Sequence, residues 1–200
     1  MGKLLLTGVD GNLGSEAAKI LMELESKENL IFCGYNPESL EAYSKQGIET
    51  RVTNFNEPDG LVEAFKGADV LALISMPFVG VKRQNAHKNA VDAAKAAGVK
   101  QIIYTSLVNA DDETNPSVEK KDHIYTEKYI KEVGLDYQFM RNSQYAEAMI
   151  TNYFTYVHII HHLLIHRAMD LWHIYHVKIV RKQLLMHFTE AASSMKKYGI

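Results

Sequence analysis

The sequence predicts an α/β protein built on a doubly wound parallel sheet in three layers, with an atypical helical C-terminal tail. Two observations support this. Short apolar runs alternate six times with segments of helical periodicity, a pattern typical of parallel strands joined by right-handed crossovers. The first apolar run ends at a glycine, and two more glycines follow at three-residue intervals before a helix-forming segment.

The turn after the first run has the spacing GxxGxxG, formed by Gly8, Gly11 and Gly14. Gly8 and Gly11 permit a tight turn and close approach to a phosphate, and Gly14 lets the helix pack near the strand. The helix N-terminus offers N–H donors and partial positive charge to a pyrophosphate. The residues between the glycines complete the predicted cofactor-binding turn: Val9, Asp10, Asn12 and Leu13. Since one glycine often serves a turn for structural reasons alone, the flanking strand and helix carry the Rossmann-type prediction.

The first half of the chain is expected to contain four strands, each a short apolar run: 3–8, 30–35, 48–52 and 70–74. Helices are expected over 12–25, from Asn36-Pro37 onward, and over 57–65. Pro37 suits a first helical position, and Gly67 suits the end of the third helix. The run 70–74 is apolar throughout, which indicates a central strand.

The second half is expected to contain a long helix over 81–97 that stops at Gly98, then a strand over 101–105. The polar segment 109–117 is expected to be a loop. A helix over 118–133, closed by Gly134, and a strand over 135–140 follow. Together these elements form one predicted domain, residues 1–155.

Composition limits the classes of partner. The chain is 46% hydrophobic and 23% charged, which suits one globular domain with or without an appendage. A net charge of −2 argues against a nucleic-acid or anionic-membrane partner. The start of the chain lacks a signal-peptide pattern, and no apolar run approaches the ~20 residues of a membrane span. The single cysteine, Cys33, suits a buried structural thiol in a reducing compartment, so a cytoplasmic location is expected.

In a sheet of this kind ligands lie beyond the carboxyl ends of the strands. The second strand ends at Tyr35, where a NAD enzyme usually places an acid and a NADP enzyme an arginine, so the choice between NAD and NADP stays open. Asn54 and Phe55 follow the third strand, where they either border an adenine or form a plain turn. The fourth and fifth strands end in further candidates: Ser75, Met76, Thr105 and Ser106.

Several segments resemble a known family in order and spacing. They are LLLTGVDGNLG, NPESLEAYSKQGIE, FKGADVLALIS, AVDAAKAAGVKQIIYTSL, HIYTEKYI and MRNSQYAE. The resemblance, over about residues 1–155, is to the NmrA-like atypical short-chain dehydrogenases, and within them to the NAD(P)H:quinone oxidoreductase type 2 group. It implies a Rossmann nucleotide site and, in active members, hydride transfer from NADPH to a quinone. Other relatives are redox sensors that bind the nucleotide without turnover, and this alternative stays open.

The resemblance also assigns roles to residues. It places the three glycines in the phosphate loop, and it places Tyr35 where the family usually has the arginine for a 2′-phosphate. Asn54 stands where an aspartate often precedes the aromatic residue. Strand ends near the nicotinamide match Ser75, Thr105 and Ser106, and the segment bordering the substrate matches Asn142 and Tyr145.

No catalytic residue is assigned. The Tyr-x-x-x-Lys pair of short-chain dehydrogenases is absent, because Tyr125 is followed four residues later by Tyr129. A quinone can accept hydride from a correctly oriented nicotinamide, so the cofactor would carry the chemistry and the protein would position it. His87 is expected to be a packed helix residue. For His123, a role on the substrate side is weighed against a structural one.

The character of the chain changes after about residue 156. Seven of the nine histidines follow it, and His158, His162 and His166 share a helix face at i, i+4, i+8. This spacing can ligate zinc or nickel, but an amphipathic helix or an unselected sequence is the favoured explanation, so no metal site is predicted. Residues 156–200 are treated as a separate His-rich tail.

A frameshift would account for this tail. Reverse translation of residues 167–179, read from the third base of each codon, permits GNGxxAYISRKD, which resembles the family segment that leads into its substrate-binding lobe. On this hypothesis the tail replaces the lobe that forms the far wall of the cleft. Hydride transfer needs water excluded from the site, so weakened or absent turnover is expected. The electron acceptor and the oligomeric state stay open.

Overall fold

A computed structural model describes residues 2–112, 114 and 117–143. Six strands form one sheet in the order β3-β2-β1-β4-β5-β6, and every neighbouring pair is parallel. The strands are β1 (Lys3–Leu6), β2 (Leu30–Gly34), β3 (Glu49–Val52), β4 (Ala68–Leu73), β5 (Gln101–Leu107) and β6 (Asp136–Asn142). This order confirms the predicted doubly wound sheet of the Rossmann type.

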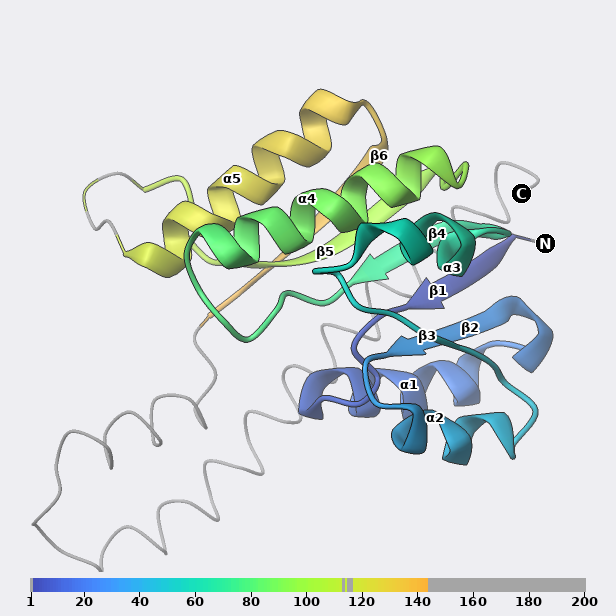
Figure 1. Ribbon diagram of the computed structural model, residues 1–200. Coiled ribbons are helices and arrows are strands. Elements are labelled where there is room, and N and C mark those ends of the chain that lie inside the picture. Colours follow the sequence, from blue (N-terminus) through green and yellow to red (C-terminus); the bar gives the residue numbers. More distant parts are fainter. Residues whose placement is uncertain (1, 113, 115–116, 144–200) are drawn as a thin grey trace, which may run out of the picture.

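Helices cover both faces of the sheet (Figure 1). They are α1 (Asn12–Leu24), α2 (Pro37–Ser44), α3 (Leu61–Phe65), α4 (Val81–Ala96) and α5 (Val118–Val133), with the short 3-10 helices η1 (Lys27–Asn29) and η2 (Pro58–Gly60). Figure 1 shows α1 and α2 on one face of the sheet and α3, α4 and α5 on the other. The helices therefore change face between β1 and β4, where the strand order reverses.

Each face of the sheet has its own hydrophobic core. Alternate residues of β1 point to opposite faces: Leu5 packs with α3, α4 and α5, whereas Leu4 and Leu6 pack with α1 and α2. Since both faces are covered, the central strands read as continuous apolar runs rather than alternating ones. β4 shows this most clearly, with Leu71 and Leu73 in one core and Val70 in the other.

Most predicted element boundaries are confirmed to within two residues, with one structural difference. The expected helix over 57–65 is divided into η2 and the short α3. Pro58 and Gly60 lie in its first turn, and both residues disfavour a regular helix. The first strand also ends earlier than expected, at Leu6, because Gly8 turns the chain with a φ of 67°.

Two capping predictions are confirmed. Pro37 occupies the first turn of α2 behind Asn36, whose side chain accepts the Glu38 N–H at 3.0 Å. Gly134 ends α5 in the left-handed conformation, with φ 74°.

Cys33 is fully buried in β2, and burial raises the pKa of its thiol to about 12. It is therefore the structural thiol that the sequence predicts. In the part of the chain that the structure describes, no helix is long and apolar enough to cross a membrane. Those same residues contain no cluster of His, Cys, Asp and Glu that could hold a metal ion. The histidines at 158, 162 and 166 lie outside the described residues.

Candidate functional site

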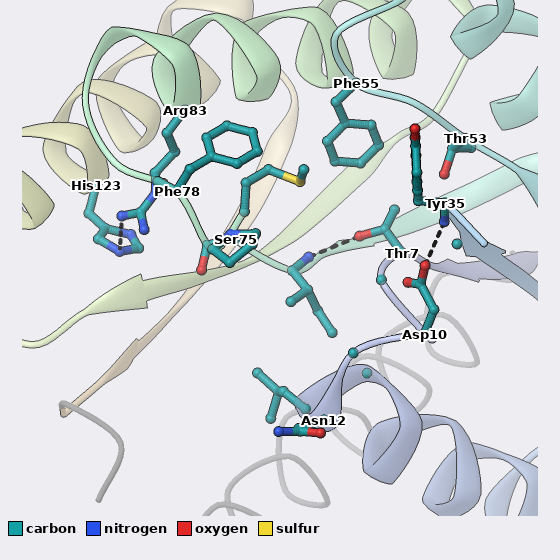
Figure 2. A pocket seen from close by; sticks show the side chains of 18 of the residues that line it. Thr7, Asp10, Asn12, Tyr35, Thr53, Phe55, Ser75, Phe78, Arg83 and His123 are labelled. Carbon is teal, nitrogen blue, oxygen red and sulfur yellow. Dashed lines mark hydrogen bonds between the residues drawn. The ribbon is translucent and has the colours of Figure 1, made fainter. Parts of the chain in front are cut away.

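A cavity of about 940 Å³ lies along the carboxyl ends of the strands. Strand-end loops and the N-termini of α1 and α4 contribute to its wall (Figure 2). The predicted residues that line it are Gly8, Asp10, Gly11, Asn12, Leu13, Gly14, Tyr35, Asn54, Phe55, Ser75, Met76, Ser106, His123 and Asn142. The topology therefore gathers segments more than 130 residues apart in sequence around one space.

Three of the residues predicted for the site are not among those that line the cavity. The Val9 side chain is buried in the core between β1, β2 and α1, so it packs rather than lines the cavity. Thr105 is also buried, and its hydroxyl accepts the Ser75 N–H at 2.8 Å, which fixes the end of β4. Tyr145 lies outside the described residues.

The glycine turn is packed too tightly for side chains. A Cβ on Gly14 would lie 1.9 Å from the Gly8 carbonyl oxygen, so α1 starts in direct contact with the backbone of the turn. Gly11, at the N-cap of α1, has no side chain to cap the helix. The first N–H groups of α1 therefore face the cavity without a capping group, as an anion site requires.

Thr7 fixes the crevice at the strand-order reversal. Its hydroxyl donates to the Ala72 carbonyl at 3.1 Å and accepts the Ile74 N–H at 3.0 Å. Thr7, which follows β1 directly, is thereby tied to the end of β4. Figure 2 marks the hydrogen bond that its hydroxyl accepts with a dashed line. This bond holds the two neighbouring strand ends at a fixed separation beneath the cavity.

Asp10 bridges the glycine turn and the end of β2. Its Oδ2 accepts the N–H groups of Tyr35 at 2.8 Å and Asn36 at 3.0 Å. A Cβ on Gly34 would lie 3.1 Å from the Asp10 carboxyl carbon, so the glycine leaves room for this carboxylate. The Tyr35 side chain is 69% exposed at the rim. An acid therefore does lie at the end of β2, but it comes from the glycine turn.

Asn54 and Phe55 serve the turn and the cavity wall together. Asn54 donates to Glu57 at 2.8 Å and accepts the Asn56 N–H at 3.1 Å, which is a side-chain-stabilised turn. Phe55 is largely buried, and its carbonyl accepts from Asn89 at 2.9 Å. The turn alternative considered from sequence is thus present, and both residues also border the cavity.

Arg83 is a nearly buried cation at the opposite end of the cavity (Figure 2). Its Nε donates to the Phe78 carbonyl, and its Nη1 lies 3.4 Å from Nε2 of His123. Asp122, fully buried on α5, lies 3.9 Å from the same guanidinium. Asp122 also accepts the Gly80 N–H at 2.6 Å, so it ties the start of α4 to α5.

Both described histidines stay neutral. Burial, together with the nearby Arg83 charge, lowers the pKa of His87 to about 3 and that of His123 to about 4. His87 is fully buried and accepts the Met76 N–H at 3.0 Å, which confirms its predicted packed role. His123 lines the cavity wall, and its substrate-side role stays a prediction.

An ion pair with one buried partner, Glu127, and one partly exposed partner, Arg141, supports Ser106. The Ser106 hydroxyl donates to Glu127 at 2.6 Å, and Glu127 accepts two hydrogen bonds from Arg141 at 3.0 and 2.7 Å. Glu127 is fully buried on α5, and its hydrogen bonds raise the pKa of Arg141. Arg141 precedes Asn142 on β6, so the pair also fixes the strand that carries Asn142 to the cavity.

Sequence reasoning missed part of the lining. The additional residues are Thr7, Gly34, Thr53, Asn56, Ile74, Pro77, Phe78, Lys82, Arg83, Leu107, Glu119 and Ser143. Most of them immediately precede or follow a predicted strand-end residue. A prediction that included the neighbours of each strand-end residue would therefore have contained them. Arg83 and Glu119 lie in first turns of helices, where the sequence alone does not distinguish a buried charge from an exposed one.

Comparison with known proteins adds to this geometry. A family model described as NAD(P)H-binding matches residues 8–158. Quinone oxidoreductase 2 of Escherichia coli is 38% identical over 144 residues, which is 72% of this chain and 49% of that protein. An NmrA-like family domain-containing oxidoreductase of Aspergillus flavus is 30% identical over 152 residues, 72% of this chain and 48% of its own length. The chain thus spans about half the length of these curated relatives.

Solved structures of two such relatives also resemble the fold of this chain. The E. coli NADPH-dependent quinone oxidoreductase in complex with NADPH superimposes with a TM-score of 0.69 at 36% identity, over 74% of this chain and 52% of that one. A triphenylmethane reductase of Citrobacter sp. in complex with NADP(H) gives a TM-score of 0.69 at 32% identity over the same shares of the two chains. With its Rossmann-type sheet and a family model that matches most of its length, this chain belongs to the NAD(P)H-binding, NmrA-like family.

Proposed function

We propose that the chain binds a nicotinamide dinucleotide along the strand ends and presents it for hydride transfer to a quinone-type acceptor. One observation carries the proposal. A single cavity extends from the glycine turn and the end of β2 to Ser75, Ser106 and His123 at the ends of β4 and β5 and on α5. An extended dinucleotide needs this arrangement, with its phosphates at a helix N-terminus between two separate ends.

The residues present fit such a ligand. The clash that a Cβ on Gly14 would make leaves only backbone at the start of α1, and Gly11 leaves those N–H groups uncapped. We assign the pyrophosphate to these N–H groups, which include those of Asn12 and Leu13. Tyr35, Asn54 and Phe55 lie at the end that we assign to the adenosine.

The other end would hold the nicotinamide and the acceptor. The bound nicotinamide supplies the hydride. Ser75 and Met76 are fixed through Thr105 and His87, and Ser106 is fixed through Glu127, so these groups form a rigid wall. Such a wall orients a ligand with little loss of side-chain entropy on binding. The buried Arg83 and His123 would keep this end polar while α4 and α5 exclude water.

The acceptor is proposed from the relatives, whose names describe quinone oxidoreductases. No observation on the described residues favours the sensor alternative over the enzyme. Residues 156–200 lie outside the described part of the chain, and the frameshift with its weakened turnover stays a prediction. Reading the gene through this region tests it: an uninterrupted frame without the offset segment would contradict the frameshift.

The test is a fluorescence titration of the purified chain with NADH and NADPH, followed by nucleotide oxidation in the presence of a small quinone. We expect saturable binding of at least one reduced nucleotide and quinone-dependent oxidation at a rate below that of the longer relatives. Binding without oxidation would remove the enzyme proposal and leave a nucleotide-binding protein. Binding of neither nucleotide would refute the proposal altogether.

A further inference from the structure

The end of β2 carries the negative charge of Asp10, and no cation among the described residues forms an ion pair with it. We propose that Asp10 makes this site select NAD(H) over NADP(H), an inference that rests on the proposed dinucleotide binding. In a Rossmann-type sheet, the residues at the end of β2 read the adenosine ribose, whose 2′ position is a hydroxyl in NAD and a phosphate in NADP. The sequence places Tyr35 there, and the structure adds the Asp10 carboxylate.

The first argument concerns hydrogen-bond donors. Backbone N–H groups in a strand-end turn are the usual donors to a bound phosphate. Here the N–H groups of Tyr35 and Asn36 already donate to Asp10 Oδ2, at 2.8 and 3.0 Å. A carboxylate therefore occupies the position where these amides would receive an anionic ligand. A 2′-phosphate would have to displace it.

The second argument concerns charge. The cations that line the cavity among the described residues are Lys82 and Arg83 at the start of α4. Figure 2 shows Arg83 at the end of the cavity opposite to Asp10 and Tyr35. Arg51, on the neighbouring strand β3, donates instead to Glu49 and to the carbonyl of Ala64. Since no guanidinium of the described ranges pairs with Asp10, a doubly charged 2′-phosphate beside this carboxylate would experience net repulsion.

The third argument concerns the free oxygen of the same carboxylate. Asp10 Oδ1 makes no hydrogen bond to any residue in the described ranges, whereas Oδ2 is held by two amides. The carboxylate is thus fixed in orientation with one acceptor still available. Ribose hydroxyls are donors, and a carboxylate oxygen is the acceptor that NAD sites use for them. The same group therefore favours a hydroxyl and opposes a phosphate.

Nucleotide titration of two variants tests the inference. Asp10→Asn removes the charge but keeps a carbonyl oxygen for the two amides, and Glu16→Gln removes one charge from the exposed Glu16–Lys19 pair on α1 as a matched control. We expect the wild-type chain and the control to bind NADH at least about tenfold more tightly than NADPH, equivalent to about 1.4 kcal/mol. In Asp10→Asn this preference should fall about tenfold. Thermal unfolding of each variant verifies that it is folded.

A second titration isolates the adenosine end. AMP and its 2′-phosphorylated counterpart lack the nicotinamide, so their relative affinity reports only on the surroundings of Asp10. The wild-type chain should prefer AMP, and Asp10→Asn should lose this preference. Equal or tighter binding of NADPH by the wild-type chain would overturn the inference while leaving dinucleotide binding intact. An unchanged preference in Asp10→Asn would also overturn it, and binding of no nucleotide would remove the proposed function itself.

Discussion

The hydroxyl of Tyr104 lies 2.7 Å from Nδ1 of His123, and both side chains are almost completely buried between the sheet and α5. Arg83 has only donors, so Nε2 of His123 accepts from it and Nδ1 carries the ring proton towards Tyr104. The Tyr104 hydroxyl also lies 3.4 Å from Nδ1 of His87, and the same nitrogen lies 3.0 Å from the Thr126 hydroxyl. A polar chain therefore runs from the cavity wall at Arg83 into the interior of the protein.

Replacing Tyr104 with phenylalanine should destabilise the protein by about 1–3 kcal/mol, because the buried Nδ1–H of His123 loses its acceptor while the ring contacts remain. Urea unfolding measures the change. Tyr137→Phe is the matched control, since Tyr137 is 46% exposed and its ring stacks on Phe139 in either form. A Tyr104→Phe variant as stable as the control would show that the hydrogen bond contributes nothing.

The neutral histidines predict a loss of stability in acid. The pKa of His87 falls from its ordinary 6.5 to about 3, so below about pH 6.5 the unfolded chain binds a proton that the folded chain does not. Stability should fall between pH 6.5 and about 3. From pH 7 to pH 5 the contribution of His87 is about 2 kcal/mol.

Urea unfolding at both pH values, for the wild-type chain and His87→Gln, isolates this contribution from the carboxylates. The variant should be less stable at pH 7 because the Met76 N–H bond is altered, but it should lose about 2 kcal/mol less on acidification. Between pH 7 and 8 the two proteins should show parallel curves. An identical acid dependence for both would contradict a neutral, buried His87.

Alanine at Gly14 should destabilise the fold by about 1–3 kcal/mol and weaken nucleotide binding, because its Cβ would lie 1.9 Å from the Gly8 carbonyl oxygen. In an ordinary helix the same change stabilises by about 1 kcal/mol. Gly60→Ala is the control: Gly60 has φ −92°, and a Cβ there would meet nothing within 4 Å. Thermal unfolding and nucleotide titration of both variants test this, and equal behaviour would refute the close contact.

The substitution Glu127→Gln should lower the free energy of unfolding by about 2–3 kcal/mol. It leaves Arg141 without its buried carboxylate partner and weakens the acceptor for the Ser106 hydroxyl. The exposed pair Glu63–Lys66 provides the control, and Glu63→Gln should change stability by less than about 0.5 kcal/mol. Chemical unfolding of both variants gives the comparison. Equal effects would show that burial adds nothing to the Glu127–Arg141 pair.

The fold was predictable from the sequence because its signals are local. Apolar runs such as 70–74, the glycine spacing and the caps at Pro37 and Gly134 each depend on the chemistry of a few adjacent residues. These local signals predicted which helices and strands form and in what order they follow one another. The helix expected over 57–65 is less regular than predicted. Pro58 and Gly60 disfavour a regular helix, although the apolar residues around them have helical periodicity.

Much of the cavity lining was predictable for the same reason. Parallel strands bring their carboxyl ends to one edge, so Ser75 and Ser106 are expected together, whereas Asn142 is expected there only from the family resemblance. Val9 and Thr105 follow the same rule but face the interior, since side chains alternate along a strand and its continuation. Their direction depends on packing, which the spacing of residues does not reveal.

The sequence by itself determined the class of fold, the phosphate turn and the edge of the sheet at which the cavity lies, because short-range patterns encode all three. Only the tertiary structure decided the charges around that cavity. It brought Asp10 to the end of β2, buried Arg83 against His123, and paired Glu127 with Arg141. Such contacts join residues far apart in the chain, and their energies depend on distance and desolvation, which exist only once the chain has folded.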